Sequence, residues 1–258
     1  MYEIDGPLDM TAFFSFCGIK GYDNLRYPEA HPHKPWSMIQ MERENKHNIF
    51  DMIREKDLLV HLPYESFDDS VVNFVASAAS DPNVLAIKQT LYRVSSSSPI
   101  IQALEKAAQN GKQVTVLMEV KARFDEANNI LMARRLEKAG AHVIYGLVGL
   151  KTHSKCTLVI RREKDGIRRY VHVATGNYNA STAKLYTDLG IFTCNDRFGT
   201  DASAFFNLLS GYSDPPIWDS FIVAPINLRQ RCMELIDREI HFALQGEPAR
   251  IVAKMNSL

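Results

Sequence analysis

Apolar positions follow two different patterns along the chain. From residue 84 to 146, short apolar runs alternate with longer segments of helical periodicity, and VLAIKQTLYRV (84–94), QVTVLMEV (113–120) and AHVIYG (141–146) are typical of buried strands. The segments between them predict helices over 100–110 and 125–140. Strands and helices that alternate at about 30-residue spacing predict right-handed crossovers and parallel pairing.

The second pattern begins after residue 150, where strand-like segments are joined by short connections. Residues 153–162, 167–175 and 185–193 predict strands, and Asp165-Gly166 is a hairpin signal between the first two. Residues 201–212 and 228–244 predict amphipathic helices. The expected fold class is therefore α/β, with a mixed, largely parallel sheet flanked by helices.

Composition limits the class of protein. The 258 residues are 46% hydrophobic and 23% charged, which is typical of a globular chain. Thirty basic and thirty acidic side chains cancel, although residues 1–70 hold 7 basic and 13 acidic ones, so residues 71–258 carry +6. Such a balance predicts no nucleic-acid partner. No apolar run reaches the roughly 20 residues of a transmembrane segment. Four widely spaced cysteines without a CxxC motif favour a reducing, cytoplasmic compartment.

Basic side chains recur where the predicted strands end. Arg93 closes the first strand, Arg123 follows the second, and His153 opens the strand after the third, at intervals of 30 residues. Because ligands bind at the carboxyl ends of strands in open α/β sheets, these groups could converge on a phosphate-bearing ligand. Salt bridges of the two arginines with Glu119 and Asp125 at the sheet rim explain the pattern equally well.

The segment GLKTHSKCTLVIRR adds a candidate nucleophile. On a strand, His153 and Lys155 point to the same face, so a neutral imidazole could attack phosphorus while the ammonium neutralises the developing charge. ATGNYN (174–179) follows and supplies Thr175, Asn177 and Asn179, which suit the orientation of a histidine or the binding of a phosphoryl oxygen. Lys151 and Lys184 are either further phosphate contacts or solvated lysines.

The combination HSK…TGNYN resembles the His-x-Lys…Asn signature of the phospholipase D superfamily. Within it, the chain is identified as a member of the bacterial polyphosphate kinases of the first type, because the resemblance covers nearly the whole chain: IREKDLLVHLPYESF, AIKQTLYRVSSSSPII, VTVLMEVKARFDE, GLKTHSK, HVATGNYN and AKLYTDLGIFT. Ile160 stands where the superfamily usually has an aspartate, a departure that these kinases share. The resemblance implies a phospholipase D-like catalytic domain.

The resemblance also implies an activity and a set of site residues. The family transfers the terminal phosphate of ATP reversibly to inorganic polyphosphate through a phosphohistidine, which corresponds to His153. Arg93 and Arg123 match phosphate-binding positions associated with Mg²⁺, and since arginine cannot ligate a cation, that association is expected to run through the phosphate. Tyr186 matches a residue that contacts the nucleotide. ATP or ADP, polyphosphate and Mg²⁺ are thus the expected ligands.

Family members are much longer than this chain, so the resemblance predicts a fragment. Residues 1–40 are expected to end a preceding helical domain, residues 41–222 to form the first catalytic domain, and residues 223–258 to begin a second. The fragment alone is expected to be inactive, and the full-length protein to form homo-oligomers, with peripheral membrane association left open. The alternatives are a phospholipase D-like phosphodiesterase or nuclease, and a non-catalytic polyphosphate- or nucleotide-binding module.

Overall fold

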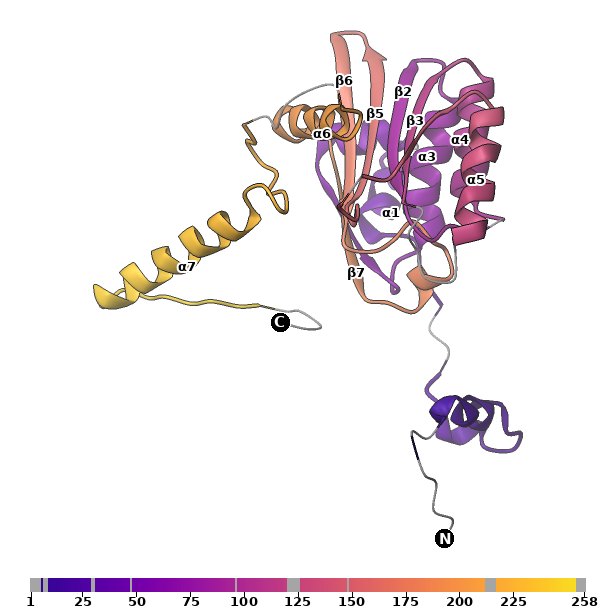
Figure 1. Ribbon diagram of the computed structural model, residues 1–258, viewed down its shortest axis with the longest axis vertical. Helices are drawn as coiled ribbons and strands as arrows, with labels where there is room; N and C mark the ends of the chain where they lie inside the picture. The colour runs from indigo at the N-terminus through magenta and orange to yellow at the C-terminus, as the bar shows by residue number, and fades with distance from the viewer. Residues whose placement is uncertain are drawn as a thin grey trace. The chain divides into compact units, whose positions relative to one another are not determined.

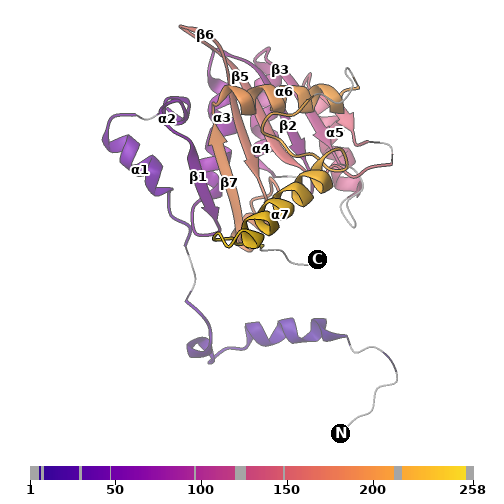
Figure 2. The same ribbon diagram turned by 90° about the vertical axis from the view of Figure 1, so that its left-hand side faces the viewer.

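A seven-stranded sheet organises the larger part of the chain (Figures 1 and 2). The computed structural model describes residues 6, 9–28, 31–46, 48–95, 97–119, 126–147, 149–211 and 217–253. These fall into two units, residues 1–31 and 32–258, which are described separately. The first contains the 3₁₀ helices η1 (Met10–Gly18) and η2 (Asp23–Leu25), neither of which has a buried residue.

In the second unit, the strand order is β1-β7-β6-β5-β2-β3-β4. The strands are β1 (Leu58–Leu62), β2 (Val84–Leu91), β3 (Gln113–Met118), β4 (His142–Tyr145), β5 (Lys155–Glu163), β6 (Gly166–Ala174) and β7 (Asp188–Thr193). The helices are α1 (Trp36–Arg43), α2 (Ile49–Glu55), α3 (Asn73–Ser80), α4 (Pro99–Gln109), α5 (Glu126–Lys138), α6 (Asp196–Leu209) and α7 (Leu228–Leu244), with a π-helical turn η3 (Asp68–Val72) and a 3₁₀ turn η4 (Thr182–Lys184).

The sheet separates two hydrophobic cores. Because successive strand residues point to opposite faces, Ile87, Val159 and Phe192 pack with apolar residues of α1 to α5. Leu158 and Val171 point the other way and pack with Phe206 and its neighbours on α6. Helices thus cover both faces of the sheet, which confirms the predicted mixed α/β architecture. None of the residues of α7 is buried.

The expectation of a largely parallel sheet is wrong. Parallel pairing is confined to β2–β3 and β3–β4, whereas the other four of the six strand pairings are antiparallel. The connection from β4 to β5 covers only residues 146–154, too short for the crossover that a further parallel strand requires. The chain instead re-enters the sheet beside β2 from the edge at which β4 ended.

Several predicted helix ends are confirmed. The Ser98 hydroxyl accepts a hydrogen bond from the Ile101 amide and caps α4 ahead of Pro99. Gly111 and Gly140, which follow α4 and α5, adopt positive φ angles of 79° and 98°. α6 begins at Asp196, earlier than predicted, because the Asn195 side chain accepts from the Arg197 amide at 3.0 Å. None of the helices in the described ranges is both long and apolar enough to span a membrane.

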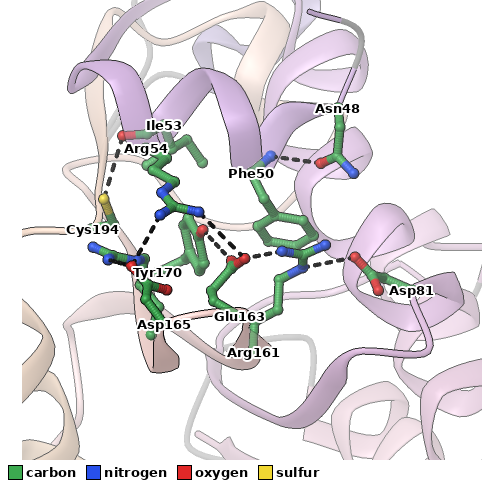
Figure 3. A network of polar contacts seen from close by, with 11 residues as sticks. Asn48, Phe50, Ile53, Arg54, Asp81, Arg161, Glu163, Asp165, Tyr170 and Cys194 are labelled. Atoms are coloured by element: carbon green, nitrogen blue, oxygen red, sulfur yellow. Dashed lines mark hydrogen bonds and ion pairs between the residues drawn. The ribbon is translucent and has the colours of Figure 1, made fainter.

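A partly buried ion-pair network ties α2 to the β5–β6 hairpin (Figure 3). Glu163 accepts hydrogen bonds from the Arg161 guanidinium and the Tyr170 hydroxyl, each at 2.6 Å. Arg161 also donates to Asp81 at 2.8 Å and lies over the ring of Phe50, 5.3 Å from its centroid. Burial alone would raise the pKa of Glu163, but the hydrogen bonds and nearby guanidinium groups outweigh it, so its pKa is lowered.

Candidate functional site

The antiparallel pairing of β5 with β2 creates the candidate site. It brings the start of β5 to the sheet edge where the parallel strands β2, β3 and β4 end. The Thr90 hydroxyl fastens this junction, because it donates to the Ser154 carbonyl at 2.8 Å and accepts from the Cys156 amide at 3.0 Å. His153, just before β5, therefore lies at the same edge as Arg93, just after β2.

His153 and Lys155 are in direct contact. The Lys155 ammonium lies 3.0 Å from Nδ1 and 3.3 Å from Nε2 of the imidazole, and it donates to the His153 carbonyl at 2.6 Å. The strand β5 begins only at Lys155, so His153 precedes it rather than opening it, but the two side chains lie side by side as expected. Lys155 is 7% exposed, whereas His153 lies open at the surface. The ammonium group of Lys155, held in place by its burial, therefore lies beside the accessible imidazole of His153.

The electrostatics of the pair favour a neutral imidazole beside a cation. Desolvation lowers the pKa of His153 below its ordinary value of 6.5, and the charges of Lys155 and Lys151 lower it further. Desolvation also lowers the pKa of Lys155 to about 8, against the opposing attraction of Asp188. At pH 7 the lysine is thus mostly protonated, while the histidine nitrogen has a lone pair available for nucleophilic attack.

Arg93 occupies an unusual backbone conformation at this edge. Its φ angle is 54°, in the left-handed region that costs a non-glycine residue about 1 kcal/mol or more. The Asn179 amide donates to the Arg93 carbonyl, while its side-chain oxygen accepts from the amides of Ser181 and Thr182. Asn179 therefore joins the turn after β6 to the end of β2. This gives Asn179 a positioning contact with Arg93.

The ATGNYN turn also holds a carboxylate. The Thr175 hydroxyl donates to Asp188 at 2.8 Å, and a Cβ on Gly176 would lie 2.5 Å from the other oxygen of the same carboxylate. Glycine at 176 thus leaves room for Asp188. The negative charge of Asp188 partly offsets the lowering of the Lys155 pKa by burial. Asn177 directs its side-chain oxygen inward, where it has no hydrogen-bond partner in the described structure and lines a cavity of about 10 Å³.

His172 lies beneath this turn and lines the same cavity. It is 1% exposed, and one ring nitrogen, Nδ1, is 2.9 Å from the Tyr178 hydroxyl. Desolvation lowers the pKa of His172 to about 3, so the ring stays neutral at ordinary pH. Its packing is close, because a Cβ on Gly190 would lie 2.7 Å from Nε2. His172 is therefore a support of the turn rather than a second exposed nucleophile.

We expect Gly190→Ala to lower the free energy of unfolding by about 1–3 kcal/mol, since the added methyl collides with a ring that cannot move aside in the core. Urea denaturation followed by circular dichroism measures the change. Gly18→Ala is the control, because a Cβ there meets no atom within 4 Å. Equal stability of the Gly190→Ala protein and the original protein would contradict the close packing of His172.

The predicted site residues are only partly brought together. His153, Lys155, Arg93 and Asn179 meet at one edge, as described above. Tyr186 is 60% exposed, in the segment between η4 and β7, and makes no described contact with that group. Arg123 lies outside the described residues, as does Asp125. The assignment of phosphate and nucleotide contacts to these side chains stays a prediction.

Sequence reasoning missed Asp188 and Tyr92 and left the role of Lys151 open. Asp188 belongs to the quoted AKLYTDLGIFT motif, but only the β6–β7 register shows that it faces Thr175 and Gly176. Tyr92 precedes Arg93 and lies with its ring centroid 6.2 Å from that of His153. Lys151 donates to the Tyr92 hydroxyl at 3.1 Å. A signal existed for Tyr92 in its position next to Arg93, and Lys151 was already one of the two lysines that could contact phosphate or be solvated.

The described residues do not form a resident metal centre. No group of three or more His, Cys, Asp or Glu side chains in the described ranges could hold a metal ion. The positively charged groups at the site favour an anion instead.

These features define a mixed α/β domain with a histidine–lysine pair among cationic side chains at one sheet edge. The family model "Polyphosphate kinase C-terminal domain 1" matches residues 48–215, and "Polyphosphate kinase C-terminal domain 2" matches residues 221–258. The chain belongs to the polyphosphate kinase family. This confirms the resemblance found in the sequence motifs.

Individual relatives agree with the family models. The polyphosphate kinase of Halalkalibacterium halodurans is 54% identical over 260 residues, and that of Exiguobacterium sibiricum is 52% identical over 261 residues. Both alignments cover 100% of this chain but 36% and 35% of the relatives, so the chain spans about a third of their length. The crystal structure of the Porphyromonas gingivalis polyphosphate kinase superposes with a TM-score of 0.76 and 34% identity, covering 88% of this chain and 37% of that one.

Proposed function

We propose that this chain carries the phosphohistidine site of a polyphosphate kinase, which transfers the terminal phosphate of ATP reversibly to inorganic polyphosphate. The observation that supports this most strongly is the contact between His153 and Lys155, with 3.0 Å between Nζ and Nδ1. A low pKa keeps the exposed imidazole unprotonated, and the ammonium is placed to meet the charge of an approaching phosphoryl group.

The transfer has two steps. In the first, a nitrogen of His153 attacks the γ-phosphorus of ATP, a nitrogen–phosphorus bond forms, the bond to the bridging oxygen breaks, and ADP leaves. In the second, a terminal oxygen of polyphosphate attacks the same phosphorus, the nitrogen–phosphorus bond breaks, and the imidazole is regenerated with a chain one phosphate longer. Lys155 stabilises the negative charge that increases on the phosphoryl oxygens in both steps.

The remaining site residues have assisting roles in this proposal. Arg93 and Arg123 bind phosphate oxygens, and Asn177 and Asn179 hold the turn beside them. Tyr186 contacts the nucleotide, which its exposed position permits. Mg²⁺ enters with the phosphates of ATP or ADP and screens their charge. The protein is proposed to work in the cytoplasm as a homo-oligomer of the longer chain.

The test of this proposal is label transfer. The longer protein that contains this chain is incubated with [γ-³²P]ATP, and the label is located by proteolysis and mass spectrometry after alkaline quenching, since phosphohistidine is acid-labile. We expect the label on His153 and its removal by added polyphosphate. We expect the 258-residue chain alone to show little turnover, because it spans about a third of its relatives.

The rate of labelling should depend on pH with two limbs. It should fall as the pH drops through the pKa of His153, below 6.5, because the protonated ring has lost its lone pair. It should also fall above about pH 8, where Lys155 loses its proton. Single-turnover labelling between pH 5 and 9.5 measures this profile, and Lys155→Arg should retain activity on the alkaline side. An unchanged alkaline limb in Lys155→Arg would contradict the assignment of that limb to Lys155.

A binding-only role is the second candidate, and the partial coverage of the relatives favours it for the isolated chain. It predicts saturable binding of polyphosphate or ATP without a label on His153, and loss of binding in the Arg93→Ala, Arg123→Ala double variant. A phosphodiesterase or nuclease would instead hydrolyse bis-p-nitrophenyl phosphate. The presence of Ile160 at the usual aspartate position disfavours this function. The same protein preparation, tested with a diester, polyphosphate and labelled ATP, separates the three functions.

A further inference from the structure

Tyr92 lies at the centre of a group of cationic side chains next to His153. The Lys151 ammonium donates to its hydroxyl at 3.1 Å and also lies 4.8 Å from the centroid of its ring. The Arg93 guanidinium lies 5.3 Å from the same centroid, and the ring of His153 is 6.2 Å away. One aromatic side chain thus contacts two cations and borders the proposed nucleophile.

The contacts with Tyr92 restrict the Lys151 side chain. A lysine on an exposed loop has up to about 2 kcal/mol of rotamer entropy to lose when it binds an anion. The hydroxyl of Tyr92 fixes the position of the Lys151 ammonium, and the face of the ring attracts the same charge. Much of the ordering is therefore complete before any ligand arrives, so a bound anion gains affinity from it.

The charge distribution shows which kind of ligand this arrangement suits. Lys151 has no carboxylate partner among the described residues, and its charge acts on both His153 and Lys155. Lys155 and Arg93 lie at the same edge, where Asp188 acts on Lys155 and the buried Glu119 carboxylate accepts a hydrogen bond from the Thr152 amide at 2.8 Å. The repulsion between Lys151 and Lys155 raises the free energy of the empty site, and an anion with several charges relieves it.

We propose that Tyr92 is a positioning residue, which holds Lys151 as a binding group for the phosphate chain next to His153. This inference rests on the proposed function and adds a recognition element to it. The ligand is an oligophosphate, whose successive phosphates offer several negative charges to Lys151, Arg93 and Lys155. Tyr92 acts through Lys151 and takes no part in the transfer itself.

A double-mutant cycle on the 258-residue chain tests the inference, with tripolyphosphate as the probe in isothermal titration calorimetry. We expect Lys151→Ala to weaken binding about tenfold and Tyr92→Phe about threefold, since the ring remains but the hydroxyl is lost. In the Lys151→Ala background, Tyr92→Phe should have no further effect. Lys151→Arg should bind within about twofold of the original chain, because the charge is kept. Lys164→Ala, at the far end of β5, is the control for loss of one positive charge.

A spectroscopic measurement complements the cycle. The pKa of His153, followed by side-chain NMR, should rise in Lys151→Ala toward its ordinary value, because one of the cations that lowers it has gone. Lys151→Arg should restore the lower value and Lys164→Ala should leave it unchanged. In the original chain, burial lowers the pKa of His153 most, followed by the charges of Lys155 and Lys151. A change in folding alone would not produce this pattern.

Three results would overturn the inference. If Tyr92→Phe weakens binding equally with and without Lys151, Tyr92 does not act through that lysine. If the original chain does not bind tripolyphosphate, or Lys151→Ala binds it as tightly, Lys151 is not a phosphate-binding group. Labelling of His153 is measured separately. Absence of the label with an intact binding cycle would therefore contradict the proposed phosphohistidine and not the role of Tyr92.

Discussion

His153→Gln should abolish the ³²P label that ATP transfers to the longer protein, with a loss of at least about 10³-fold in the rate of transfer. Glutamine keeps a polar side chain of similar reach but has no nitrogen lone pair that can attack phosphorus. The side chain lies at the surface, so the substitution leaves the core intact. The contact of Lys155 with the His153 carbonyl involves the backbone and remains available.

His142→Gln is the matched control for this experiment. His142 is an exposed histidine on β4, and it has no described contact with the site. We expect this variant to be labelled at the original rate. Label of unchanged intensity in His153→Gln, or label that maps to another histidine, would contradict the assignment of the phosphohistidine to His153. Circular dichroism of both variants checks that neither change disturbs the fold.

The second large effect concerns the ion-pair network at the other end of β5. Glu163→Ala should lower the free energy of unfolding by about 3–5 kcal/mol, because it leaves the partly buried guanidinium of Arg161 without one of its two carboxylates and the Tyr170 hydroxyl without its acceptor. The Glu163 side chain is 8% exposed, so water cannot replace the lost partner easily. Urea denaturation followed by circular dichroism measures the loss.

Asp165→Ala is the control, since it removes a carboxylate from the same hairpin that pairs with Arg54 and Arg168 at the surface. Its side chain is 49% exposed, and the change should cost no more than about 1 kcal/mol. Equal losses of stability in the two variants would contradict the claim that the less exposed carboxylate, Glu163, contributes more to stability than Asp165. The pKa of Glu163 is lowered in the fold, so its contribution is present above pH 4.5 and is lost as the pH falls through the folded value. The difference between the original protein and Glu163→Ala should therefore shrink in acid.

The part of the fold that could be predicted is the part with local signals. The segment from Val84 to Tyr145 alternates strand and helix, with a cap at Ser98 and glycines at 111 and 140, and the structure follows that pattern. The Asp165-Gly166 turn likewise produced the expected hairpin. The position of β5 beside β2 has no local signal, because it depends on which side of the existing sheet the chain returns to. β1 was not predicted either, because its place in the sheet depends on pairing with β7, which lies far along the sequence.

The site was predictable as a set of residue types but not as an arrangement. The spacing of HSK was sufficient to place His153 and Lys155 on one face. It could not show that Asn179 would contact the backbone of Arg93, or that Asp188 would face Thr175, since both depend on the register of strands far apart in sequence. The contact between Tyr92 and Lys151 likewise joins residues 59 positions apart and has no local signal.

The antiparallel joint between β2 and β5 has a consequence for the kinetics of folding. The pairs β2–β3 and β3–β4 form between segments that are close in sequence, whereas the Thr90 contacts with Ser154 and Cys156 close a loop of more than 60 residues. Loop closure of that length is slow compared with local pairing, so the β2–α4–β3–α5–β4 segment should become ordered first. His153 acquires its contact with Tyr92 only when β5 docks beside β2. The NMR signal of its ring therefore reports the late docking step of folding.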